Sequence, residues 1–64
     1  MYAKLKQYRK SKYVTGEVLS KLLGLQTISA YHKKENGKVP FTLEEAKKIS
    51  DFFNKKIDYL FFQD

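Results

Sequence analysis

Apolar residues recur along the chain three and four positions apart, the spacing that places side chains on one face of an α-helix. The first such segment covers residues 3–12, in which Leu5 and Tyr8 share a face. The second begins after Thr15, whose hydroxyl can cap free backbone amides, and ends at Gly24, which suits the left-handed turn that closes a helix. The apolar stripe of this second helix is Val18, Leu19, Leu22 and Leu23.

A third helix is expected after a short turn. Thr27 is again an N-cap candidate, and the helix runs from Ile28 to about Lys34 or Glu35. The turn dipeptide Asn36-Gly37 then ends it.

Two more helices complete the pattern. The sequence Thr42-Leu43-Glu44-Glu45 matches a capping box, which predicts a helix that ends near Phe53-Asn54. Its expected apolar face is Leu43, Ala46, Ile49 and Phe53. A short helix over residues 57–61 follows. No alternating run of five residues argues for a sheet, so the sequence predicts an all-α, five-helix fold.

The expected core is aromatic. Ten of the 64 residues are Phe or Tyr, more than so small a core can enclose. Tyr31 is expected to seat the third helix, because it points away from that helix's polar start. The other candidates for the core are Tyr8, Phe41, Phe52 and Phe53.

Length and composition narrow the class of protein. A chain of 64 residues is one domain, here residues 1–64. It has no cysteine and one histidine, which leaves no disulfide, no Cys/His nucleophilic pair and no multi-histidine metal site. We therefore expect no enzyme, no metal and no cofactor. No apolar run approaches the ~20 residues of a membrane span, and no signal-peptide block is present, so we expect a cytoplasmic protein without membrane contact.

The positive charge is concentrated in the first part of the chain. Residues 1–38 hold nine Lys or Arg against two Glu, a net charge of +7, whereas residues 39–64 carry a net charge of −1. The sequence pI is about 9.6. Lysines gathered on part of a small domain are typical of a protein that binds a phosphate backbone. The alternative is a solvated surface that only maintains solubility.

Two short helices joined by a turn with a glycine, over about residues 15–35, have the form of a helix-turn-helix. In that motif the second helix enters the DNA major groove and reads base edges from its N-terminal part. The expected base-reading residues are Ile28, which can pack on a thymine methyl, Ser29, and Lys33 one turn later. Any small helical bundle also contains two helices and a turn, so the pattern alone leaves that alternative open.

Four segments in order carry a resemblance to a known family: residues 15–24, residues 27–38 with the sequence Glu35-Asn36-Gly37-Lys38, residues 41–49, and residues 57–61. Together they resemble the Cro/CI (xenobiotic-response-element) family of helix-turn-helix regulators. The resemblance implies a lambda-repressor-like domain that binds double-stranded operator DNA, commonly as a homodimer, in phage or bacterial transcriptional control. We expect a repressor.

Three departures from the family's outline bear on the site. Gly16 stands where the family has a glutamine that braces a phosphate, and Ser20 where it has alanine. The distance from Gly24 to Asn36 is one residue longer than usual. If the extra residue lies in the turn, at about Gln26, the base-reading residues are as given above. If it lies inside the helix, they shift by one.

The expected contacts with the DNA backbone surround the motif. The hydroxyls of the two N-caps, lysines beside the motif, the single histidine and the turn after the third helix can each meet a phosphate. These residues are Thr15, Lys21, Thr27, His32, Lys34, Asn36 and Lys38. For His32 a solvent-exposed role and a packing role also remain open. Arg9 and Lys10 either flank the DNA or are solvated charges.

The end of the chain predicts an apolar patch. Tyr59 and Phe62 lie three apart, opposite the inward residues of the last helix, and such a patch suggests self-association as a homodimer. Partial cover by Tyr2 is the alternative. The patch also supports a second hypothesis for function, a helical protein-interaction module of phage or bacterial origin. RNA binding is a further alternative, disfavoured because no sheet-type aromatic platform is expected.

Overall fold

A computed structural model describes residues 2–62, which form five α-helices and, within that range, no strand. The helices are α1 (Ala3–Ser11), α2 (Gly16–Leu22), α3 (Ile28–Glu35), α4 (Leu43–Phe53) and α5 (Ile57–Phe61). The predicted all-α, five-helix fold is confirmed, with each helix within one or two residues of its expected range. Among these helices none is long and apolar enough to cross a membrane.

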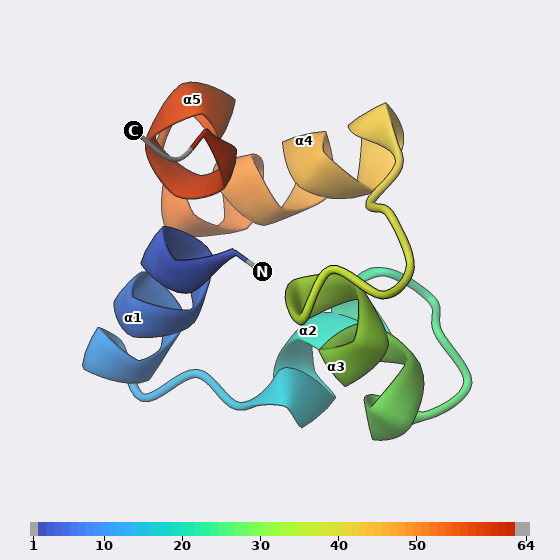
Figure 1. Ribbon diagram of the computed structural model, residues 1–64. Coiled ribbons are helices and arrows are strands. Elements are labelled where there is room, and N and C mark those ends of the chain that lie inside the picture. Colours follow the sequence, from blue (N-terminus) through green and yellow to red (C-terminus); the bar gives the residue numbers. More distant parts are fainter. Residues whose placement is uncertain (1, 63–64) are drawn as a thin grey trace.

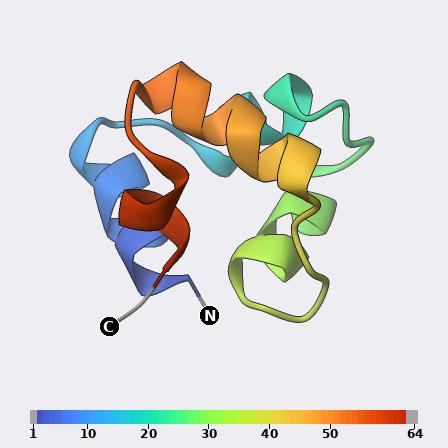
Figure 2. The same ribbon diagram turned by 90° about the horizontal axis from the view of Figure 1, so that it is seen from above.

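The helices form two groups. α1 and α5 lie side by side at one end of the molecule, and α2 and α3 pack together at the other (Figure 1). α4 spans the two groups, since it contacts both α5 and α2 (Figure 2). The helix-turn-helix unit is therefore joined to the rest of the domain by α4, and also by the Tyr2 N–H before α1, which donates to the Glu35 carbonyl at the end of α3.

The buried core draws residues from every helix. Tyr31 is fully buried, as expected, and lies among aliphatic side chains from α1, α2, α4 and α5. The other buried apolar residues are Leu5, Leu19, Leu23, Ala46, Ile49, Leu60 and Phe61. Since isolated helices of this length are marginal in water, packing around Tyr31 supplies most of their stability.

Three predicted N-caps are present. The Thr15 and Thr27 hydroxyls accept hydrogen bonds from backbone amides three residues on, at 3.3 and 3.0 Å. At α4 the capping box is complete, because Thr42 and Glu45 each accept from the other's backbone N–H. The local signals in the sequence thus fix the starts of the three central helices.

Four helices end in the same way, with one residue in the left-handed region after the last turn. These residues are Tyr13 (φ 59°), Gly24 (φ 74°), Gly37 (φ 86°) and Asn54 (φ 55°). In each case the next residue donates its N–H to the carbonyl five positions back, at 2.9–3.0 Å, as in a Schellman motif. Tyr13 is the exception in residue type, because glycine and asparagine adopt the left-handed region readily and tyrosine is strained there.

Two residues expected in the core are exposed instead. Leu43, on the predicted apolar face of α4, is 77% exposed, because it is the first residue of the helix and precedes the turn that packs on the core. Phe52 is 46% exposed, and its ring meets that of Phe53 edge-to-face at 5.1 Å between centroids. Tyr8, Phe41 and Phe53 are half-buried against the core, in agreement with expectation.

Replacing Tyr13 with glycine should stabilise the domain. The side chain is 94% exposed and buries little, so its removal relieves the left-handed strain at small loss. We expect Tyr13→Gly to raise the free energy of unfolding by about 1 kcal/mol. Urea unfolding checks this, with Gln7→Gly as a control that should lose stability because Gln7 is exposed in the middle of α1. A less stable Tyr13→Gly protein would contradict the account of this turn.

Candidate nucleic-acid interface

A buried cluster of charged and polar groups seats α3. The Arg9 guanidinium donates to both carboxylate oxygens of Glu35, from Nε at 2.9 Å and from Nη2 at 3.1 Å. The Tyr31 hydroxyl donates to the same carboxylate at 2.8 Å. Arg9 also donates from Nη1 to the Val14 carbonyl at 2.9 Å. The cluster therefore joins α1 and the loop after it to the last two turns of α3.

The cluster changes the pKa values of its members. Burial raises the pKa of Glu35, but the hydrogen bonds from Arg9 and Tyr31 outweigh it and hold that pKa below its ordinary value. The hydrogen bond to Glu35 raises the pKa of Arg9 despite burial. Burial, together with the Glu35 carboxylate, raises the pKa of Tyr31 far above its ordinary value, so the phenol remains a donor. All three groups keep the protonation states that bind one another.

α2 and α3 form a helix-turn-helix around the left-handed Gly24. The start of α2, the loop before it and the start of α3 lie along one edge of the molecule, away from α4 and α5 (Figure 1). α3 runs without interruption from its N-cap Thr27. The N-cap at Thr27 is the premise of the first of the two alternatives above, in which the extra residue lies in the turn.

The polar side of α3 is exposed. Ile28 is 44% exposed, and Ser29, His32 and Lys33 are exposed. Helical periodicity places these four residues within a continuous arc, on the other side of the helix from Tyr31. The three residues expected to read bases, Ile28, Ser29 and Lys33, are thus brought together on one surface by the fold.

The expected backbone contacts mostly surround this arc. Thr15 and Thr27 are exposed at the two N-caps, where each hydroxyl accepts from an amide and keeps its own hydrogen to donate. Asn36 and Lys38 are exposed in the turn that ends α3. Lys21 is exposed and pairs with Glu17 at 3.5 Å, a solvated pair that leaves the ammonium accessible.

Lys34 is engaged elsewhere. Its ammonium donates to Glu45 at 2.9 Å and to the Pro40 carbonyl at 3.1 Å, and its side chain is only 12% exposed. Burial raises the pKa of Glu45, but the hydrogen bonds from the Thr42 N–H and the Lys34 ammonium outweigh burial. The pKa of Glu45 is therefore below its ordinary value. The pair ties α3 to the start of α4, so Lys34 is not available as the backbone contact that the sequence suggested.

Arg9 also differs from expectation. It was expected either to flank the DNA or to be a solvated charge, but it is 6% exposed and fully engaged inside the protein. A signal in the sequence points to this, because Arg9 lies four residues after the buried Leu5 and so shares its face. Lys10, the next residue, is exposed.

Gly16, the first residue of α2, is covered by His32. A Cβ at position 16 would lie 2.8 Å from Nε2 and 3.0 Å from Cε1 of the imidazole, and 3.4 Å from the Tyr31 ring. Position 16 has a negative φ, so its backbone does not demand glycine. Comparison of the sequence with the family showed that position 16 lacks the usual glutamine side chain. The crossing of α2 and α3 shows that the His32 imidazole lies over that position.

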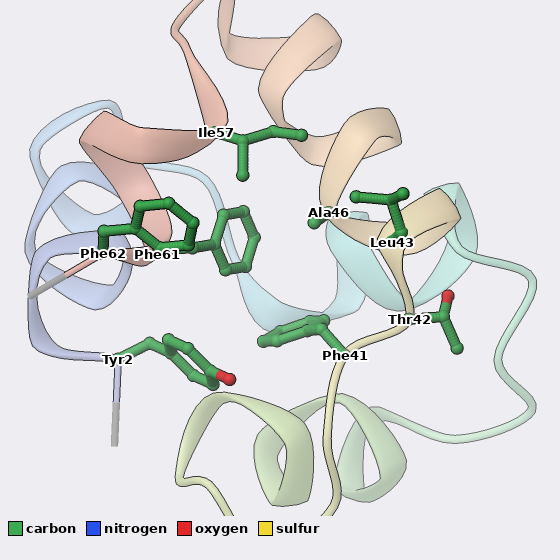
Figure 3. A pocket seen from close by; sticks show the side chains of 8 residues that line it. All are labelled: Tyr2, Phe41, Thr42, Leu43, Ala46, Ile57, Phe61 and Phe62. Atoms are coloured by element: carbon green, nitrogen blue, oxygen red, sulfur yellow. The ribbon is translucent and has the colours of Figure 1, made fainter.

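The C-terminal aromatic residues fall into two clusters. Tyr59 is half-exposed and packs edge-to-face on Tyr8, with Lys55 above its ring. Phe62, just past α5, is 61% exposed and borders an apolar cavity of about 440 Å³ (Figure 3). Tyr2 lines that cavity and packs on Phe61, so it covers part of the surface beside Phe62. The cavity is completed by Phe41, Thr42, Leu43, Ala46 and Ile57.

Comparison with known proteins gives one match. The family model described as Helix-turn-helix matches residues 5–60, which is most of the chain and includes all of α2, α3 and α4. No curated protein and no solved structure gives a significant match.

Replacing Glu35 with glutamine should weaken the fold in a way that depends on pH. Loss of the carboxylate leaves Arg9 buried without a counter-charge, so we expect about 3 kcal/mol less stability near neutral pH. Because the pKa of Glu35 is lowered in the folded protein, its contribution is complete above the unfolded pKa of about 4.5 and is lost as pH falls through the folded value. The difference between wild type and Glu35→Gln should therefore shrink in acid.

Urea unfolding over a range of pH from about 7 to 3 measures that difference. Glu17→Gln is the matched control, since Glu17 belongs to an exposed pair and should change stability by less than about 0.5 kcal/mol. A constant difference between Glu35→Gln and wild type down to the lowest pH would contradict the assigned role of the carboxylate.

Proposed function

The chain belongs to the Cro/CI-type helix-turn-helix family of DNA-binding transcriptional regulators, and we propose that it is a repressor that recognises an operator sequence with α3 in the major groove. The observation that carries the proposal is the exposed arc of α3, which faces away from the core while Tyr31 and Glu35 fix the opposite side. A protein bound at a promoter can block transcription by occupying the DNA alone, whereas an activator also needs a surface that contacts the polymerase. Repression is therefore the simpler of the two roles.

The proposed base contacts follow from side-chain chemistry. Ile28 offers an apolar surface to a thymine methyl, Ser29 can donate to or accept from several bases, and Lys33 can donate to guanine acceptors. All three are exposed on α3, and the N-cap at Thr27 sets where the helix begins. A one-turn spacing between Ser29 and Lys33 suits neighbouring base pairs in the groove.

The proposed backbone contacts are the exposed groups around that arc. Lysine ammoniums and Thr or Asn side chains bind phosphate oxygens without reading sequence, and they supply the salt-dependent part of the affinity. Of the residues suggested by sequence we retain Thr15, Lys21, Thr27, His32, Asn36 and Lys38. Lys34 is omitted because Glu45 and Pro40 hold its ammonium.

We also propose that the protein binds DNA as a homodimer. The apolar surface around Phe62 and Leu43 is the support, because both side chains are more than half exposed at the edge of the cavity (Figure 3). Tyr59, which the sequence also suggested for the interface, belongs to a separate cluster with Tyr8 and is half-exposed. A two-fold dimer presents two α3 helices to half-sites about 34 Å apart and requires a palindromic operator.

The same apolar cavity favours a second candidate function, in which the fold binds another protein through Phe62 and Leu43. The two functions differ in their response to salt. An operator-binding protein loses affinity steeply as salt rises and prefers one duplex, whereas an interaction module shows neither property.

Base-reading and backbone residues should respond differently to truncation. Duplexes are first selected from a random pool, and affinity is then measured for the winner and for a scrambled duplex. We expect Ser29→Ala and Lys33→Ala each to weaken binding to the winner by about 1–3 kcal/mol and to leave the scramble nearly unchanged. Lys38→Ala should weaken both duplexes alike. Equal losses on both duplexes for all three variants would contradict the assigned roles.

The dimer is tested by removing the exposed phenyl group. Phe62→Ser should lower self-association measured by sedimentation equilibrium and should weaken binding to a full palindrome about tenfold more than binding to a single half-site. Tyr13→Ser is the control, since it removes an even more exposed ring outside this surface. A wild-type protein that remains monomeric on a palindromic duplex would rule out the dimer.

A further inference from the structure

Gly16 has no local reason to be glycine. Its φ is negative, it lies at the start of a regular helix, and glycine is a poorer helix former than alanine. The loop residues that require a left-handed backbone are elsewhere, at Gly24 and Gly37. The reason for glycine at position 16 must therefore lie in what packs against it.

What packs against it is the end of one side chain. The two atoms closer than ordinary contact to an added Cβ are Nε2 and Cε1 of His32, at 2.8 and 3.0 Å. The Tyr31 ring, at 3.4 Å, stays within van der Waals distance. A side chain at position 16 thus leaves the backbone crossing of α2 and α3 intact and displaces only the imidazole.

His32 is otherwise free to leave. It is exposed on the arc of α3, and its ring meets Tyr31 edge-on at 5.8 Å between centroids. No hydrogen bond to its imidazole is present among the described residues. The hollow over Gly16 is the feature that holds the ring between the first residue of α2 and the second turn of α3, beside the proposed base-reading residues.

We propose that Gly16 is a positioning residue for His32: by lacking a side chain it seats the imidazole where α2 crosses α3, and the seated imidazole donates to a DNA phosphate. This inference rests on the proposed DNA-binding function. It makes the proposed phosphate contact of His32 depend on the backbone of α2 as well as on α3, the helix proposed to read the bases.

The proposal separates stability from DNA binding. Gly16→Ala should unfold at the same or a higher urea concentration than wild type, because alanine favours the helix and the imidazole can swing away. It should nevertheless bind the selected duplex and a scrambled duplex about tenfold more weakly, as should His32→Ala. Lys48→Ala, on α4 at the opposite edge of the molecule, is the surface control and should bind as wild type does.

The double variant decides whether the two residues act as one. If Gly16 works through His32, the double variant Gly16→Ala/His32→Ala binds DNA about tenfold more weakly than wild type. If the two residues act independently, their losses of affinity multiply to about a hundredfold. His32→Gln, which keeps an N–H donor, should recover most of the affinity when residue 16 is glycine and little when it is alanine. In the free wild-type protein, a nuclear Overhauser effect is expected between imidazole Hε1 and Gly16 Hα.

Three results would overturn the inference. They are a hundredfold loss in the double variant, wild-type binding by Gly16→Ala, and a Gly16→Ala protein that is less stable than wild type. A wild-type protein that binds no duplex at all overturns the proposed function instead, because the comparison among variants then has no DNA binding to measure. The two failures are therefore distinguishable in one set of titrations.

Discussion

The ion pair between Arg9 and Glu35 is the interaction on which the arrangement of this domain depends. A buried charge is unfavourable unless it is paired and hydrogen-bonded, and here both carboxylate oxygens are occupied and the guanidinium reaches the Val14 carbonyl as well. The backbone adds to the same junction, since the Tyr2 N–H donates to the Glu35 carbonyl at 3.0 Å. Both ends of α1 are thus tied to the end of α3.

This junction explains how so short a helix can present a defined surface. α3 has eight residues, too few to be stable alone, and it is held on one side by Tyr31 and Glu35 and at its end by the pair of Lys34 with Glu45. The remaining side of the helix has no role in the core. A rigid helix with one uncommitted side is what direct reading of base edges requires, because a mobile one would lose binding free energy on ordering.

Much of the fold is visible in the sequence because its signals are local. The caps at Thr27 and Thr42 act within three residues, and the exposed position of Ser29 follows from helical periodicity alone. The partners of Arg9 and Lys34 are not local, so both were placed on the surface although the first shares a face with Leu5. The same limit applies to the candidate site: the exposed arc of α3 could be predicted, but the seat of His32 requires the crossing of two helices that no spacing in the sequence specifies.

These long-range pairs also change how the charge of the domain should be counted. The first 38 residues carry a net charge of +7, but Lys34 is neutralised by Glu45 from the other half of the chain. Beside the helix-turn-helix the accessible cations reduce to Lys21, Lys33 and Lys38. Since the sequence-independent affinity for DNA grows with the number of phosphates neutralised, one copy brings less to the backbone than its charge suggests. The proposed dimer would double that number on a single operator, which is a physical reason for the proposal that copies associate through the exposed apolar surface around Phe62.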